Sequence, residues 1–429
     1  VVLLAMSAAS MLWAESKDSA WTAVNRLALY AAIFAIVLVV VRDRKRARTV
    51  LMILGAAALI TSLWLCASFL LGGGQGAFLE RRLNSPIGYI NGTAGLLVMG
   101  IWPWLAWAEG APRRLFRSGG LVAAALIAAT AILTQSRAVI PGLALTAVLV
   151  LLCAPNRRRR ALNLLLVASA VALSLPWTLA VYSSGGAAAR LLAPGTGTLR
   201  AAAVAILVTA LVAGVTLLIL DSAANQLELS GARRAGRRLA PLGAVVLLAA
   251  VAGGVSAAAP WISRQYHAFT SLHVDQSASV RFIDAGGYRY DLWRVAAKEF
   301  ARHPVGGLGA GNYDTEYYQL RRNPDYVLQP HSLELQTAAE LGAGGIVGLV
   351  LFVGGILWAG FARRGTLASS DIVVRIGALG MFTAWLAGTS VDWLYDLPGL
   401  AGMAMVAAAL LLVPARGGSA ASGGSCLLY

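Results

Sequence analysis

The sequence predicts an all-α polytopic membrane protein with about twelve transmembrane helices and one large, partly helical loop outside the membrane. Its 429 residues are 58% hydrophobic and only 13% charged, with a mean hydropathy of +0.71. A soluble core of this size cannot bury so much apolar surface. Charge-free windows of about twenty residues recur, and a helix of that length crosses a hydrocarbon layer of ~30 Å. Basic clusters follow every second window, as in cytoplasmic loops.

The net charge of +16 comes from short basic clusters between the apolar windows. Such clusters are topology signals rather than a surface for nucleic acid, so we expect no nucleic-acid partner. Cys66 and Cys153 lie inside apolar windows and Cys426 in the tail, a distribution that offers neither a disulfide framework nor zinc-ligand spacing. The cysteines therefore give no indication of a metal or a cofactor.

Residues 1–259 form the N-terminal transmembrane part. The predicted spans are 1–12, 22–41, 49–71, 88–107, a helical hairpin within 120–153, then 161–182, 200–220 and 239–259. The first of these is the end of a span rather than a signal peptide, and we expect the chain to be truncated there. The apolar run of 120–153 is too long for one helix and is interrupted from Thr134 to Arg137, with Pro141 following. Arg137 is therefore expected at the outer tip of a tight hairpin.

Residues 260–332 form the extracytoplasmic loop, which we predict to be the catalytic one because three of the four histidines lie in it and His331 closes it. The spacing of Tyr290, Trp293, Ala296, Ala297 and Phe300 predicts an amphipathic helix at the membrane surface.

Pro304 ends this helix, and the glycines that follow at 306, 307, 309 and 311 have two interpretations. A dinucleotide loop would need a strand before the glycines and a helix after them, and here an amphipathic helix precedes them. A turn that sets the path of the loop is favoured.

Residues 333–414 form the C-terminal transmembrane part, with spans at 333–361, 372–390 and 397–413, and the Gly/Ser-rich tail 415–429 is predicted to be disordered. The alternation of basic clusters puts Arg137, the 260–330 insertion and the turn from Asp392 to Asp396 on one non-cytoplasmic face. Any chemistry is expected on that face.

Arg137 has two interpretations, because an arginine at the tip of an apolar hairpin costs several kcal/mol unless an anion lies near it. It either reaches the interface or pairs with Asp392, or it belongs to a phosphate clamp. A guanidinium binds phosphate oxygens through two parallel hydrogen bonds and stays charged. Arg281 and Arg289 would complete such a clamp, although each taken alone is equally well explained as a solvated loop charge.

His331 follows Pro330 where the loop re-enters the membrane, with Ser332 beside it. A neutral imidazole accepts a proton from a hydroxyl, as a general base must. A single histidine at a helix start is more often a cap, but the nearby arginines favour the catalytic interpretation. Asp392 and its neighbours form an acidic and aromatic turn, which we interpret as partners of the arginines or of sugar hydroxyls rather than as a metal site.

The order of these residues resembles the bacterial O-antigen ligase and polymerase superfamily, over nearly the whole chain. The motifs that carry the resemblance are Ser136-Arg137, Arg289-x-x-Leu292-Trp293, His303-Pro304-x-Gly306-Gly307-x-Gly309-x-Gly311-Asn312-Tyr313, and His331-Ser332 followed after nine residues by Gly342-x-x-Gly345. Members of the superfamily carry a histidine followed by Ser, Asn or Gln, and a spaced glycine pattern, after a large periplasmic loop.

The resemblance implies a GT-C-like glycosyltransferase in the bacterial cytoplasmic (inner) membrane, with its active site on the periplasmic face. Such an enzyme moves a glycan from an undecaprenyl-pyrophosphate carrier to an acceptor hydroxyl, without a metal or a nucleotide sugar. By the same resemblance Arg137, Arg289 and Arg281 would hold the pyrophosphate, and His331 would activate the acceptor. Ser332, Asp392 and Tyr313 are the further substrate-binding candidates.

Several alternatives stay open. The acceptor is a glycan, a lipid such as the lipid A core, or a protein, since ligases, polymerases and protein O-oligosaccharyltransferases share the motifs. From another class, a polysaccharide transporter or flippase would also contain about twelve spans, but transporters tend to show two similar halves and the sequence shows no repeat. A non-catalytic membrane scaffold is the third interpretation.

Overall fold

The computed structural model describes residues 1–153, 157–183, 192–228, 263–264, 266–271, 287–322, 324, 327–362 and 369–414. The predicted span 239–259, Arg281 and the tail 415–429 lie outside the described residues. Within them the structure is helical, apart from one antiparallel pair of two-residue strands, β1 (Phe78–Leu79) and β2 (Arg82–Leu83).

Seven helices of the described ranges are long and apolar enough to cross a membrane. They are α2 (Lys17–Val40), α3 (Arg44–Leu70), α5 (Arg114–Ile132), α7 (Arg157–Ser183), α8 (Thr196–Glu228), α12 (Leu333–Ala362) and α13 (Ser369–Thr389). Four further apolar helices are α1 (Val2–Ser10), α4 (Ile90–Gly110), α6 (Val139–Cys153) and α14 (Pro398–Leu412). The all-α membrane architecture is confirmed, whereas the count of twelve spans stays a prediction.

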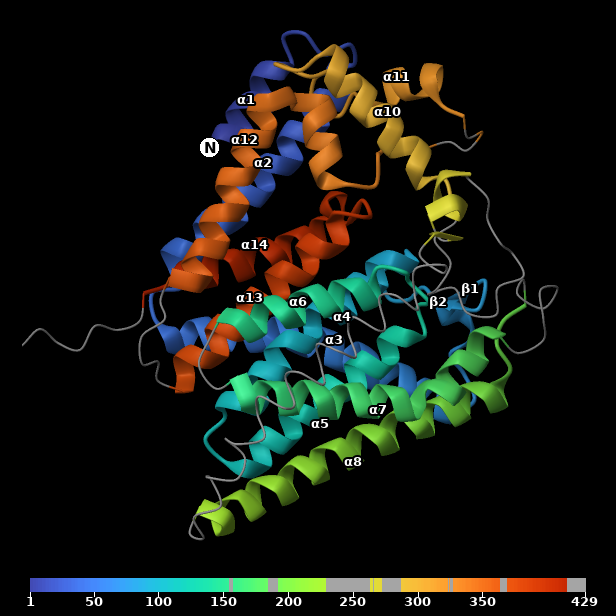
Figure 1. Cartoon of the computed structure of the whole chain (residues 1–429), viewed down its shortest axis with the longest axis vertical. Coiled ribbons are helices and arrows are strands. Elements are labelled where there is room, and N and C mark those ends of the chain that lie inside the picture. The colour runs from blue at the N-terminus through green and yellow to red at the C-terminus, as the bar shows by residue number, and fades with distance from the viewer. Residues whose placement is uncertain are drawn as a thin grey trace, which may run out of the picture.

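The helices form a single packed assembly in which α4 lies at the centre, against α3, α5 and α13 (Figure 1). Helices α7 and α8 pack on the side of α5, while α1, α2, α12 and α14 lie together on the other side. Small residues allow the close approach that helix packing in membranes requires. A Cβ at Gly100 would lie 2.2 Å from the Cβ of Ala58 on α3, and one at Gly380 would lie 2.5 Å from Trp102. Helix α4 is thus fixed on both sides.

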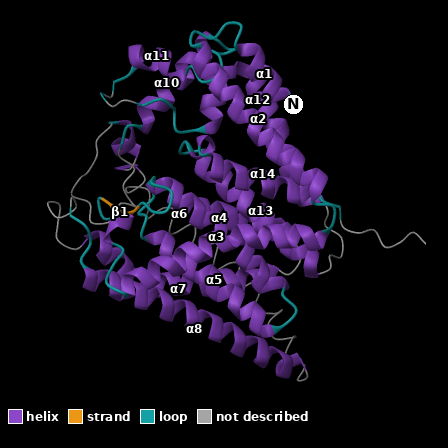
Figure 2. Cartoon of the chain, turned by 180° about the vertical axis from the view of Figure 1, so that it is seen from behind, coloured by secondary structure: helices purple, strands orange, loops and turns teal. Residues whose placement is uncertain are grey.

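Helices α5 and α6 divide the apolar run 120–153 as predicted, with Arg137 in the connecting turn. The β1–β2 pair holds this turn, because the Leu83 amide donates to the Leu133 carbonyl at 2.9 Å and Arg82 Nε donates to the Thr134 carbonyl at 3.2 Å. Figure 2 shows this strand pair beside the start of α6. The two helices and the turn are confirmed, but the tight hairpin is not: α5 packs against α4, α7 and α8, whereas α6 packs mainly against α13.

The outer region contains α10 (Arg289–Arg302) and α11 (Tyr313–Leu320). The helix predicted after residue 288 is present, and its location at the membrane surface stays a prediction. The buried face runs through Leu292, Val295 and Ala296, which pack against α11 and α12. Of the predicted stripe, Ala296 lies on this buried face, while Tyr290 and Trp293 contact another aromatic ring, Phe269, at centroid distances of 5.7 and 5.4 Å.

The glycine-rich segment after α10 is a turn, as predicted, and it packs backbone to backbone. Gly307, Gly309 and Gly311 all have positive φ, a conformation that side chains rarely adopt. A Cβ at Gly307 would lie 2.2 Å from the carbonyl carbon of Glu340 on α12. At Gly342 (φ 60°, ψ −156°) α12 itself is interrupted, and a Cβ there would lie 2.4 Å from the Val305 carbonyl oxygen. The turn therefore fits into the break of α12.

Candidate functional site

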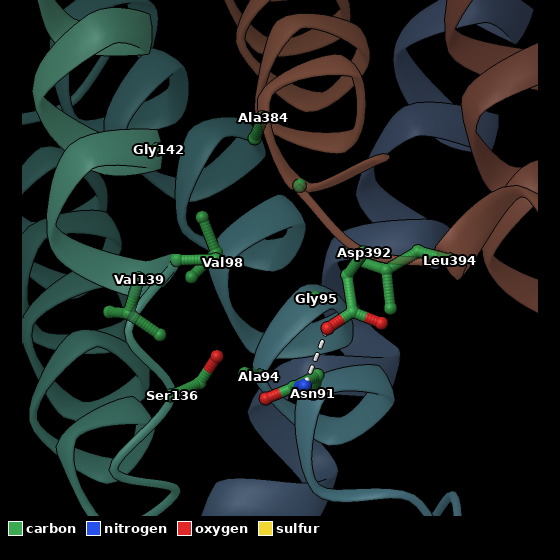
Figure 3. A pocket seen from close by; sticks show the side chains of 12 residues that line it. Asn91, Ala94, Gly95, Val98, Ser136, Val139, Gly142, Ala384, Asp392 and Leu394 are labelled. Atoms are coloured by element: carbon green, nitrogen blue, oxygen red, sulfur yellow. Dashed lines mark hydrogen bonds between the residues drawn. The ribbon is translucent and has the colours of Figure 1, made fainter. Parts of the chain in front are cut away.

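Five segments that are distant in sequence meet in one place. They are the start of α4, the α5–α6 tip, the start of α10, the residues before α12, and the turn that contains the short 3-10 helix η4 (Leu394–Asp396). Figure 3 shows Asn91, Ser136 and Asp392 from three of these segments around one pocket. Arg289 and His331 come from two others.

Asp392 lies at the centre of this arrangement, with a side chain that is 1% exposed. Its carboxylate accepts hydrogen bonds from Tyr89 Oη at 2.5 Å, Asn91 Nδ2 at 2.6 Å, Arg289 Nη2 at 2.8 Å and the Trp393 amide at 2.8 Å. Burial, followed by the negative charge of Asp392, raises the pKa of Tyr89, so its hydroxyl remains a donor. Donors thus compensate the cost of burying this charge.

Arg289 is the first residue of α10, and Asp392 is its ion-pair partner. One quarter of its side chain (26%) stays exposed. A guanidinium has five N–H donors, and Asp392 occupies Nη2. The Nε atom is buried and has no hydrogen-bond partner among the described residues. Arg289 is therefore positioned by Asp392 and still has donors for an anion.

Arg137 reaches the same place from the α5–α6 turn. Its Nη1 lies 3.7 Å from where a Cβ on Gly287 would be, and Gly287 precedes Arg289 by two residues. The backbone at Gly287 has φ 144°, a conformation that glycine adopts readily. The structure thus brings Arg137 and Arg289 together, from segments 152 residues apart in the chain (289 minus 137).

His331 is 6% exposed and stands edge-on to the Tyr288 ring at a centroid distance of 5.8 Å. Burial lowers its pKa from 6.5 to about 4; Asp392 opposes this shift and Arg289 adds to it. The imidazole is therefore neutral at pH 7. Its Nδ1 is buried without a hydrogen-bond partner in the described part of the chain. With φ of 56°, the backbone at His331 adopts a strained conformation of the kind that accompanies functional sites.

The other predicted residues have different places. Ser332 is buried and caps α12: its Oγ donates to Glu334 at 3.0 Å and accepts from the Leu335 amide at 3.4 Å. Tyr313 is fully buried, and its hydroxyl donates to the Leu292 carbonyl at 3.0 Å, so it joins α11 to α10 in the core of the outer region. The structure does not bring Tyr313 to the polar cluster around Asp392.

Sequence reasoning missed Tyr89 and Asn91, which provide two of the four hydrogen bonds to Asp392. The available signal was two polar residues, Tyr89 and Asn91, at the start of an apolar span, on the face that Asp392 shares. Among the described ranges, no group of three or more His, Cys, Asp or Glu side chains is placed to hold a metal.

A larger cavity of about 610 Å³ lies between α1, α2, α12 and α14. Its walls are mostly apolar, and its polar end contains the Arg26–Asp396 ion pair, 2.9 Å between nitrogen and oxygen, together with Gln336 and Tyr395. Burial raises the pKa of Asp396 to about 6, against the opposing effect of Arg26. Three residues separate Asp396 from Asp392, so the turn that contains η4 contributes both to this cavity and to the polar cluster.

Comparison with known proteins gives one match. A family model described as O-antigen ligase matches residues 122–353, which is more than half of the chain and includes Arg137, Arg289 and His331. No curated protein and no solved structure matches the chain.

Proposed function

Because this chain belongs to the O-antigen ligase family, a family of membrane proteins with ligase-type glycan transfer, we propose that it joins a glycan from an undecaprenyl-pyrophosphate carrier to an acceptor hydroxyl. The observation that supports this most directly is that Arg289, held by Asp392 with donors to spare, acts electrostatically on the buried, neutral His331, while Arg137 lies beside Gly287, two residues before Arg289. Such a site neutralises a departing pyrophosphate and accepts a proton without a cofactor.

In the proposed reaction the acceptor oxygen attacks the anomeric carbon of the glycan. The bond from that carbon to the pyrophosphate oxygen breaks, and the pyrophosphate leaves with the electron pair. Arg137 and Arg289 stabilise its negative charge. His331 takes the proton of the acceptor hydroxyl, for which its neutral form is required. Asp392 orients Arg289 and is itself held by Tyr89 and Asn91.

The proposal also includes the side of the membrane on which the active site lies. We place the site on the periplasmic face of the bacterial cytoplasmic membrane, because the basic clusters at 113–117 and 157–160 fall at the ends of α4, α5 and α6 that are opposite to Asn91 and Arg137. The acceptor is a glycan, a lipid or a protein hydroxyl. The family motifs do not separate a ligase from a polymerase or a protein O-oligosaccharyltransferase.

The test is transfer by the purified protein in detergent, from a lipid-pyrophosphate glycan to candidate acceptors. Arg289→Ala and His331→Ala should each lower kcat/KM by about 100-fold or more, the usual contribution of an electrostatic or general-base group. Arg302→Ala is the matched control, because its side chain lies on the same helix, is 53% exposed and pairs with Glu316. Undiminished transfer by both site variants would overturn the assignment.

A further inference from the structure

A narrow slot runs from Asp392 between α4, α6 and α13 (Figure 3). Its volume is about 20 Å³, little more than the ~10–15 Å³ that one water-sized group needs. A hydrocarbon chain is too large for it. The slot therefore suits one small substituent of a larger molecule.

The mouth of the slot carries one donor and one acceptor. Ser136 is 1% exposed, and its hydroxyl points into the slot (Figure 3). The Asn91 amide nitrogen is engaged by Asp392 and Tyr89, which leaves the amide oxygen turned toward the Ser136 side. A bound group that accepts from Ser136 and donates to Asn91 would satisfy both.

The inner part of the slot is apolar. Val98, Val139, Ala384 and Leu394 line it together with Gly142 and Gly388, and none of these side chains carries a polar atom. A hydroxyl placed there would lose its hydrogen bonds to water without replacement, at a cost of roughly 1–3 kcal/mol. A methyl group fits this part without that cost.

We infer that the slot binds the acetamido group of a sugar in the glycan donor. The carbonyl accepts from Ser136, the N–H donates to the Asn91 oxygen, and the methyl enters the apolar part. This inference rests on the proposed function, because it takes the pyrophosphate to lie against Arg137, the residue that follows Ser136. In a sugar pyrophosphate the substituent nearest to that phosphate is the one on the carbon beside the anomeric carbon.

The test compares two lipid-pyrophosphate donors that differ only at that carbon, one with acetamido and one with hydroxyl. The wild type should prefer the acetamido donor by about 10- to 100-fold in kcat/KM, as expected for a site built to bind a polar group. Ser136→Ala should lower this ratio about tenfold. Gly142→Ala should lower it too, since its Cβ meets only the Ala387 Cβ at 3.8 Å and so narrows the slot without a clash.

Gly119→Ala on α5 is the matched control, because a Cβ there meets nothing within 4 Å, and it should keep the wild-type ratio. Equal use of both donors by the wild type would overturn the inference, and so would an unchanged ratio in both slot variants. Failure of the proposed function looks different: the wild type would then transfer from neither donor. The slot is still tested in that case by direct binding of N-acetylglucosamine 1-phosphate against glucose 1-phosphate, where equal affinity contradicts it.

Discussion

At the scale of single residues, the setting of His331 determines a pH dependence. Its pKa is about 4 in the folded protein against 6.5 for the free side chain, mainly because the ring is buried. The imidazole thus stays a base until the pH falls toward 4. We expect the acidic limb of kcat/KM that belongs to His331 to lie below pH 5, and a full pH profile of transfer measures it. A limb centred near 6.5 would show that the histidine is solvated during turnover.

The same shift links His331 to stability. The unfolded chain binds a proton below about pH 6.5 and the folded one only near pH 4, so the stability present above pH 6.5 falls as the pH decreases between these values. Thermal melting in detergent at pH 7.5 and 5 should show a smaller loss for His331→Gln than for the wild type. An equal loss in both would exclude His331 as a contributor.

Tyr89 and Asn91 should act through Asp392. Asn91→Leu removes a 2.6 Å donor from a buried carboxylate, and such a loss costs roughly 1–3 kcal/mol, or about 5- to 150-fold in kcat/KM if it falls on Arg289 in the transition state. Tyr89→Phe should do the same, while Tyr266→Phe, on a 64% exposed side chain, serves as the control. A normal kcat/KM for both variants would mean that Asp392 orients Arg289 without the hydrogen bonds from Tyr89 and Asn91.

The sequence predicted those site residues whose polar side chains are energetically unfavourable beside or within an apolar span. Arg137 interrupts an apolar run and His331 lies at the start of a span, where an ionisable side chain is unfavourable unless it has a function or a partner. Tyr89 and Asn91 give no such signal, because polar residues are common at the boundary of a span. Their role follows from α4 being fixed against α13, a long-range packing that the sequence pattern does not contain.

At the scale of elements, the interruption of α12 at Gly342 packs against the glycine-rich turn and leaves no space for a side chain. A side chain at Gly342 would have to adopt φ 60° and place its Cβ 2.4 Å from the Val305 carbonyl oxygen. Gly342→Ala should therefore destabilise the protein by roughly 1–3 kcal/mol. Gly354→Ala, in the same helix with nothing within 4 Å of the added Cβ, should not. Melting temperatures of the two variants measure the difference, and equal values would contradict the packing.

Helices and turns were predicted best where the hydrophobicity pattern alone determines where an element begins and ends. The division between α5 and α6 and the glycine turn followed from an interrupted apolar run and from glycine spacing. The buried face of α10 did not, since this short amphipathic helix has aromatic residues on one side and Leu292 and Val295 on another. Which of them faces protein depends on α11 and α12, and only the assembled structure shows that.

At the scale of the whole molecule, a buried ion pair joins the opposite, basic ends of α4 and α7. Glu109 and Arg160 are 2.8 Å apart, and their side chains are 1% and 4% exposed. Removing one partner leaves a buried charge uncompensated, which typically costs about 3–5 kcal/mol. Glu109→Ala should lower the melting temperature far more than Asp43→Ala, whose pair with Arg46 is exposed. Similar melting temperatures would indicate that water reaches the pair.

The outer loop is attached to the first two helices by direct contacts. Ala310 N donates to Ser10 Oγ at 2.9 Å, Ser16 N donates to Asn312 Oδ1 at 2.6 Å, and a Cβ at Gly309 would lie 2.5 Å from the Cβ of Ala14. For protein engineering, the loop segment and the start of the chain should therefore be exchanged together. A chimera that takes residues 287–322 from a relative to change its acceptor should fold only when residues 10–19 are exchanged with them.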